Sequence, residues 1–139
     1  MRKATYSHGN ILHRGAFTVC VPGEKYAKEA DYFGIASGRT EDKFAAAGLT
    51  PVRSELVDAP YVREFPLVLE CRLAHTFELG LHTQFVGEIL DVKIDEEALG
   101  AAGKPDLEKL RPMLFAPECQ EYYGVGRSLG KAFSIGKTP

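Results

Sequence analysis

The sequence predicts a mainly β fold with inserted helices, in the form of a barrel that carries helices at one end. Residues 67–79 and 82–94 both alternate apolar and polar side chains, and only Gly80-Leu81 separates them. A period of two is typical of a half-buried strand, so the pair predicts a long hairpin. Residues 24–38 and 40–48 have helical patterns and precede this hairpin. Long hairpin strands with helices between strands favour a decorated barrel.

The first strand is expected over residues 15–23, where Phe17, Val19 and Val21 alternate with smaller or more polar side chains. Pro22-Gly23 ends it. In the next segment Tyr26 and Phe33 are spaced for one face of a helix.

Thr40 is expected to cap a compact helix over 40–48, and Gly48 is expected to end it. Residues 49–66 contain three prolines and are expected to be irregular.

The hairpin is expected to bury one face of residues 67–79. That face comprises Leu67, Leu69, Cys71, Leu73, Phe77 and Leu79, and His75 on the same face is expected to be a core residue. Residues 95–110 predict one helical turn and a surface loop, residues 111–116 a short strand, and the remainder a loop-rich tail. About four strands are too few for a closed barrel, which needs roughly six or more to fill its interior with side chains.

Composition restricts the class of protein. A chain of 139 residues suits one domain, and a net charge of −2 without long runs of one sign gives no reason to expect a nucleic-acid or membrane surface. The N-terminus has no apolar leader core, so a cytoplasmic location is expected. Cys20, Cys71 and Cys119 have no metal-binding spacing, so no metal site is expected.

Several segments together resemble the flavin reductase-like family, and within it the flavoredoxins. They are "RKATYSHGNI", "GAFTVCVP", "ADYFGIASGRTEDKF", "GLTPV", "FPLVLECRL" and "GLHTQFVGEI", in this order along the chain. The resemblance implies an FMN-binding split β-barrel that forms a homodimer. It also implies that the family's domain begins earlier, so residues 1–139 are expected to be a single domain that lacks its first strands, including an asparagine and a tryptophan that contact the flavin in relatives.

Three functions follow as hypotheses. The first is an FMN-binding redox protein, such as an NAD(P)H-dependent FMN oxidoreductase, whose electron donor is a reduced nicotinamide or another redox protein. The second is a truncated, non-enzymatic split-barrel protein with weak or no flavin binding. The third is a binding module for another small molecule. No nucleophile–base pair is present, so no catalytic side chain is expected.

Arg2, Lys3 and Ser7 are candidates for the FMN phosphate. Arginine and hydroxyl groups suit phosphate oxygens, and an extended segment would turn Lys3, Thr5 and Ser7 to the same side. The resemblance places Ser7 where relatives have a phosphate-contacting threonine. The alternative is a solvated N-terminal segment.

Lys43 lies in the first turn of the expected 40–48 helix, where a cation opposes the helix dipole. The resemblance matches it to a lysine near the cofactor, facing either the phosphate or the ring. The alternative is a surface lysine paired with Glu41 or Asp42.

His82 and Phe115 complete the candidate site. His82 matches the family's histidine in G-x-H-x-x-x-x-G-E and is expected at the barrel rim, where its ring nitrogens or its flat face would meet a planar ligand. Its alternative is a local hydrogen bond in the turn. Phe115 is expected either to contact the flavin ring or to belong to the core.

Overall fold

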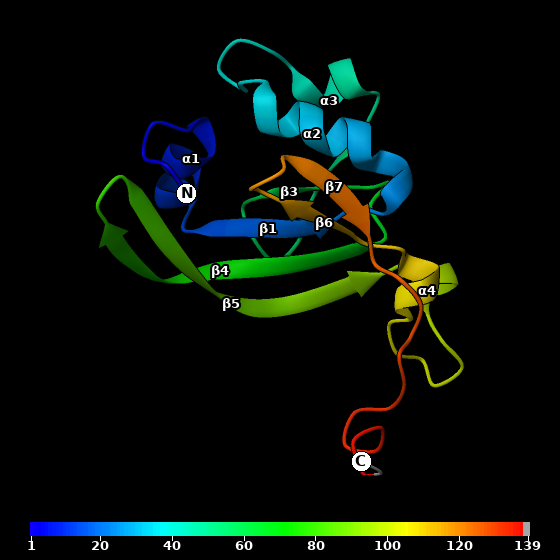
Figure 1. The fold of residues 1–139 in the computed structure, drawn as a ribbon. Coiled ribbons are helices and arrows are strands. Elements are labelled where there is room, and N and C mark those ends of the chain that lie inside the picture. Colours follow the sequence, from blue (N-terminus) through cyan, green and yellow to red (C-terminus); the bar gives the residue numbers. More distant parts are fainter. Residues whose placement is uncertain (138–139) are drawn as a thin grey trace.

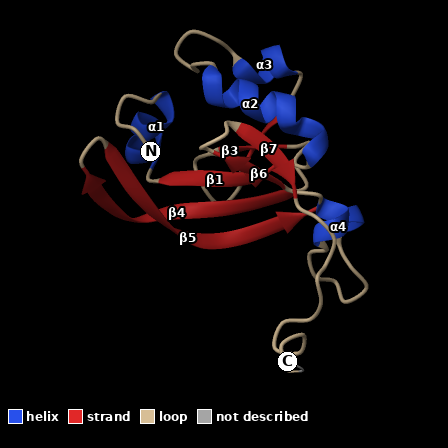
Figure 2. Ribbon diagram, viewed as in Figure 1, coloured by secondary structure: helices blue, strands red, loops and turns tan. Residues whose placement is uncertain are grey.

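The computed structural model describes residues 1–137. Figures 1 and 2 show a central sheet with helices above one side and a C-terminal segment that extends away from it. The helices are α1 (Tyr6–Arg14), α2 (Ala27–Ile35), α3 (Lys43–Ala47) and α4 (Leu107–Leu110), with short 3-10 turns at Glu24–Tyr26 and Glu96–Ala98. The strands are β1 (Ala16–Val21), β2 (Pro51–Arg53), β3 (Pro60–Val62), β4 (Leu67–Leu79), β5 (His82–Ile94), β6 (Met113–Ala116) and β7 (Glu121–Gly124).

The central sheet has the antiparallel order β1-β4-β5, and the pairs β2-β3 and β6-β7 form two small sheets beside it. The predicted hairpin is confirmed to the residue, with Leu79 opposite His82 at its tip. The strand over 15–23 is confirmed as β1. The three sheets do not close into one ring, which agrees with the mainly β, split-barrel fold that the sequence predicts.

The prediction of one continuous apolar face on β4 is wrong. The register with β5 shifts between Leu73 and His75, so Ala74 is an extra residue on β4. One extra residue turns all the following side chains to the other face, because side chains alternate with a period of two. Phe77 and Leu79 therefore lie on the face opposite Leu73. His75 is exposed and is not a core residue.

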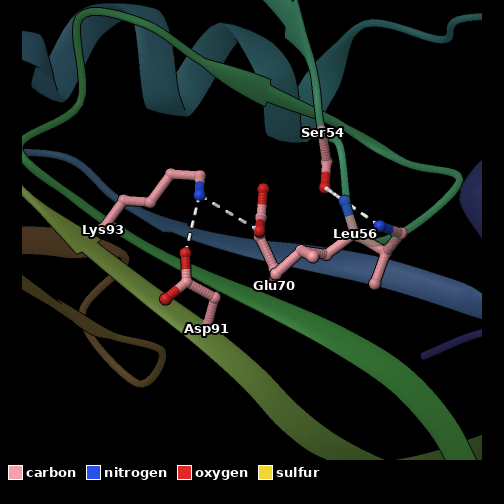
Figure 3. A network of polar contacts seen from close by, with 6 residues as sticks. Ser54, Leu56, Glu70, Asp91 and Lys93 are labelled. Carbon is pink, nitrogen blue, oxygen red and sulfur yellow. Dashed lines mark hydrogen bonds and ion pairs between the residues drawn. The ribbon is translucent and has the colours of Figure 1, made fainter.

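The buried residues of β4 are Val68, Glu70 and Cys71, and Glu70 has no exposed surface. Figure 3 shows the Glu70 side chain pointing from β4 toward the loop that holds Ser54. Lys93 lies 3.2 Å from the Glu70 carboxylate and 2.6 Å from Asp91. The hydrogen bond to Asp91, together with the contact with Glu70, raises the pKa of Lys93 above its usual value. Lys93 thus balances a carboxylate that would be costly to bury alone.

A small core joins the helices to this layer. It is formed by Leu49, Val62 and Phe65, against which Tyr26, Phe33 and Phe44 pack. Tyr26 and Phe33 therefore share a buried side, as their spacing predicts.

Four local predictions are corrected by the structure. Residues 6–14 form α1, so the extended segment that would turn Lys3, Thr5 and Ser7 to the same side is not formed. The segment 49–66 contains β2 and β3, and the C-terminal segment contains β7. These strands are three or four residues long, too short for alternation to reveal them. Asp42, not Thr40, caps α3, since its side chain accepts a 3.1 Å hydrogen bond from the Ala45 amide.

Candidate functional site

A cavity of about 1110 Å³ lies between α1, the edge strand β1, α3 and the beginning of β5. Aromatic rings form much of its wall, contributed by Tyr6, Phe17, Phe33, Phe44 and Phe85. Polar side chains from α1 and α3 face the same space. Concave sites with apolar walls and a few polar groups are typical of small-molecule binding.

The α1 wall has a polar face because of helical spacing. Ser7, Asn10 and Arg14 are separated by three and four residues, so they lie along one side of α1, and all three line the cavity. Gly15 ends the helix at φ 63°, a conformation that favours glycine. The N-cap residue Thr5 makes no capping hydrogen bond to the first turn and donates its hydroxyl to the Arg2 carbonyl at 2.9 Å.

A polar cluster attaches α1 to the tip of the hairpin. His8 Nε2 lies 2.9 Å from Thr83 Oγ1, and the Thr83 hydroxyl donates to Glu78 Oε1 at 3.2 Å. The single hydroxyl proton is then used, so His8 Nε2 is the donor in the first contact. Lys3 forms an ion pair with Glu78, and this contact is the main reason that the pKa of Glu78 lies below its usual value. The His8 ring packs on Phe85, with 5.2 Å between ring centroids.

The α2–α3 wall holds Lys43. Its Nζ donates to the Phe33 carbonyl at 2.8 Å and lies 4.9 Å from the centroid of the Phe33 ring. The carbonyls at the end of α2 attract a cation because they have no partner within the helix. Phe33 also meets Phe44 edge to face, with 5.3 Å between centroids. Lys43 is half-buried and lines the cavity.

Three acidic side chains line the cavity, and each already has a partner. Glu41 accepts a hydrogen bond from the Tyr32 hydroxyl, and Asp42 caps α3. Asp58 accepts from Arg14 at 2.5 Å. The expected alternative for Lys43, a pairing with Glu41 or Asp42, is not among the ion pairs of the described residues. The ammonium group of Lys43 is therefore not neutralised by these carboxylates.

Comparison with known proteins decides the family. The model of the flavin reductase like domain matches residues 1–123, which include the whole cavity. The chain belongs to the flavin reductase-like family. Flavoredoxin of Desulfovibrio vulgaris (Miyazaki F) is 56% identical, with a TM-score of 0.93 over 99% of this chain and 73% of that one. Flavoredoxin from Methanosarcina acetivorans is 35% identical, with a TM-score of 0.90 over 98% of this chain and 72% of that one.

Sequence relatives in this family are longer than the present chain. An uncharacterised protein of Archaeoglobus fulgidus is 39% identical over 102 residues, which are 73% of this chain and 56% of the relative. The chain spans about half the length of the curated relatives it matches. None of the helices within residues 1–137 is long and apolar enough to cross a membrane.

Six site residues were predicted from the sequence. Two of them, Ser7 and Lys43, line the cavity. Arg2 and Lys3 lie before α1, where Arg2 pairs through its backbone with His82, and neither lines the cavity. His82 is exposed and also lies outside the lining, although the adjacent Thr83 belongs to it.

Phe115 is exposed on β6, where its ring packs on Tyr122 with 5.1 Å between centroids, and it is not part of the cavity wall. It is not a core residue either. The sequence alone did not reveal Asn10, Arg14 or His8 as site residues. The available signal was the spacing of the polar residues within residues 6–14. That spacing places them on one side only if the segment is helical.

Proposed function

We propose that this flavin reductase-like protein binds FMN in the cavity between α1 and α3 and serves as a redox protein. The observation that carries the proposal is the combination of aromatic walls with cationic and hydroxyl donors in one cavity of the family-matched region. The structures of flavoredoxins that resemble this chain support it. So does the FMN-binding protein from Thermus thermophilus, at 21% identity, as a likeness of fold.

The cavity suits both ends of such a ligand. Phe17, Phe33, Phe44 and Phe85 offer flat apolar surfaces to a planar ring. Ser7 offers a hydroxyl close to the first turn of α1, where the N-cap side chain leaves the amides without a capping partner. Helix N-termini of this kind favour phosphate. We infer that the phosphate lies at this end of the cavity, with Ser7 as a donor and Arg2 contributing positive charge, whereas the charge of Lys3 is already balanced by Glu78.

Lys43 is the residue on which the proposal depends most. An ammonium has three N–H donors, and the Phe33 carbonyl accepts from one of them. The remaining donors serve an anionic ligand, either at its phosphate or at the ring. Protein groups around a bound flavin tune the two-electron chemistry that the isoalloxazine supplies. Since the acidic groups of the lining have other partners, they do not cancel the charge of Lys43.

Phe115 and His82 enter the proposal through a second copy of the chain. Because Phe115 does not line the cavity of its own chain, we propose that it contacts a flavin bound to the partner in a homodimer. His82 is proposed to border the same interface at the rim of β5. The cytoplasm is the proposed compartment, and a reduced nicotinamide or a redox protein is the proposed electron donor.

Titration of the purified protein with FMN, followed by flavin fluorescence, tests the site. Lys43→Met is expected to weaken FMN binding about tenfold or more, since a hydrogen bond to a charged group contributes roughly 1.5–3 kcal/mol. Lys28→Met is the matched control, because Lys28 is an exposed lysine of α2 that does not line the cavity. Equal affinity of Lys43→Met and the wild type would contradict the site.

Riboflavin, which lacks the phosphate, separates the two roles of Lys43. If Lys43 meets the phosphate, Lys43→Met reduces FMN affinity but not riboflavin affinity. If it meets the ring, both ligands lose affinity and the reduction potential of the bound flavin falls. Absence of FMN binding by the wild-type chain would favour the alternative, a non-enzymatic split-barrel protein. Consumption of NADH or NADPH by the FMN-loaded protein tests the nicotinamide donor.

A further inference from the structure

The C-terminal tail, defined as residues 125–137, leaves the body of the molecule beside α4 and extends away from the sheets (Figure 1). Its base is fixed by two hydrogen bonds. The Val125 amide donates to the Pro112 carbonyl at 3.1 Å, and the Ser128 amide donates to Glu108 Oε1 at 3.1 Å. The direction in which the tail leaves the body is therefore set by these contacts.

The outer part of the tail forms a turn of its own. The amides of Ser134 and Ile135 donate to the Lys131 carbonyl at 3.2 and 2.9 Å. Gly130 lies against Ile135, where a Cβ atom would come within 2.9 Å of the isoleucine Cδ1. This part of the tail has a defined shape, although it does not pack into the core of its own chain.

The conformation of the tail is energetically unfavourable when the tail has no partner. Phe133 has a φ of 60°, a left-handed conformation that is strained for a bulky side chain, and it is 96% exposed. Leu129 and Ile135 are 80% and 62% exposed. Strained backbone persists when surrounding contacts hold it. The described part of the chain supplies few such contacts, so these side chains are free to pack on a second surface.

Charge indicates which surface this is. The tail carries Arg127, Lys131 and Lys137 and no acidic residue, which leaves the rest of the chain with 14 basic and 19 acidic residues, a net charge of −5. The β6–β7 hairpin, residues 113–124, has Glu118 and Glu121 and no basic residue.

The same hairpin presents a large apolar surface. Leu114 and Tyr123 lie opposite each other in the hairpin and share one of its faces, and they are 60% and 49% exposed. The hairpin is thus complementary to the tail both in charge and in apolar character.

We propose that the tail of one copy packs on the β6–β7 hairpin of a second copy, with Phe133 as its apolar anchor. The tail follows the hairpin directly in the chain, so a single two-fold axis near Gly124 creates both contacts at once. The inference rests on the homodimer of the proposed function and assigns it an interface.

The molecular mass of the 139-residue chain in solution, measured over a range of concentrations, tests the role of the tail. The wild type is expected to dimerise, and Phe133→Asp is expected to raise the dimer dissociation constant at least tenfold. Ile35→Asp is the control, because Ile35 is 76% exposed but lies on α2. Dimerisation of Phe133→Asp at the wild-type concentration would overturn the role of the tail and leave the homodimer standing. A monomeric wild type would overturn the homodimer, while the FMN titration would still test the cofactor site.

Cross-linking tests the position of the contact. Cys119 is an exposed thiol between β6 and β7, and Ser134→Cys places a second thiol beside the anchor without removing it. A short bis-maleimide is expected to yield a covalent dimer with Ser134→Cys, and no covalent dimer when Cys119→Ser is added. A link formed only within one chain, or no link, would overturn the proposed contact.

Discussion

The two helical walls of the cavity are held in different ways. α1 is attached to the sheet by the polar cluster of His8, Thr83, Glu78 and Lys3, whereas α2 and α3 are attached through aromatic contacts with the core around Phe65. Apolar burial depends little on pH or salt, while hydrogen bonds to ionised groups depend on both. The comparison therefore predicts a cavity with one wall that responds to solution conditions and one that does not.

The largest expected effect comes from the apolar wall. Phe65→Ala is expected to lower the free energy of unfolding by about 3–5 kcal/mol, because a buried phenylalanine is replaced by a cavity. Phe77→Ala is the matched control, since Phe77 is 51% exposed, and it is expected to change stability by about 0.5 kcal/mol or less. Denaturant unfolding measures both. Equal losses in the two variants would refute the difference between the buried core around Phe65 and the exposed surface of the hairpin at Phe77.

A substitution in the polar wall is expected to lower the free energy of unfolding by a smaller amount. Thr83→Val keeps the shape of the side chain but leaves His8 Nε2 without its partner, which is expected to cost about 1–3 kcal/mol. Thr76→Val, at an exposed threonine of β4, is expected to be nearly neutral. Hydrogen exchange should show the loss mainly in the amides of α1. Uniform loss over α1 and α2 would show that the two walls open together.

Lowering the pH is expected to have the smallest effect on the stability of the α1 wall. The pKa of Glu78 is lowered from its ordinary value of 4.5, chiefly by Lys3, so the folded state favours the carboxylate. The stabilisation is present above pH 4.5 and is lost as pH falls through the lowered pKa. Exchange of α1 amides should accelerate in this range relative to α2, after correction for intrinsic rates. Glu78→Gln should remove most of that difference, and an unchanged pH profile would exclude Glu78 as its source.

The hairpin and the α2–α3 wall could be predicted from the sequence because their signals are local. β4 and β5 have alternation over thirteen residues each, and Tyr26 and Phe33 have helical spacing. Lys43 was singled out chiefly by the family resemblance, together with its unfavourable place in the first turn of a helix, and it lines the cavity.

α1 and its polar cluster were missed for a physical reason. Residues 6–14 contain two residues that become buried, His8 and Ile11, so the segment has only a weak apolar face. Its attachment comes from Thr83 and Glu78, and His8 and Thr83 are 75 residues apart in the chain. A hydrogen bond at that separation has no local pattern.

Alternating side chains determine that this protein has a long hairpin, and the flavin reductase-like segments determine its family. Which face of the hairpin is buried was decided only by the tertiary structure. A single extra residue at Ala74 turns every later side chain of β4 to the opposite face. The apolar pattern of one strand does not predict its register with the neighbouring strand. The same holds for the cavity, whose walls come from segments that meet only when the sheet, α1 and α3 have packed together.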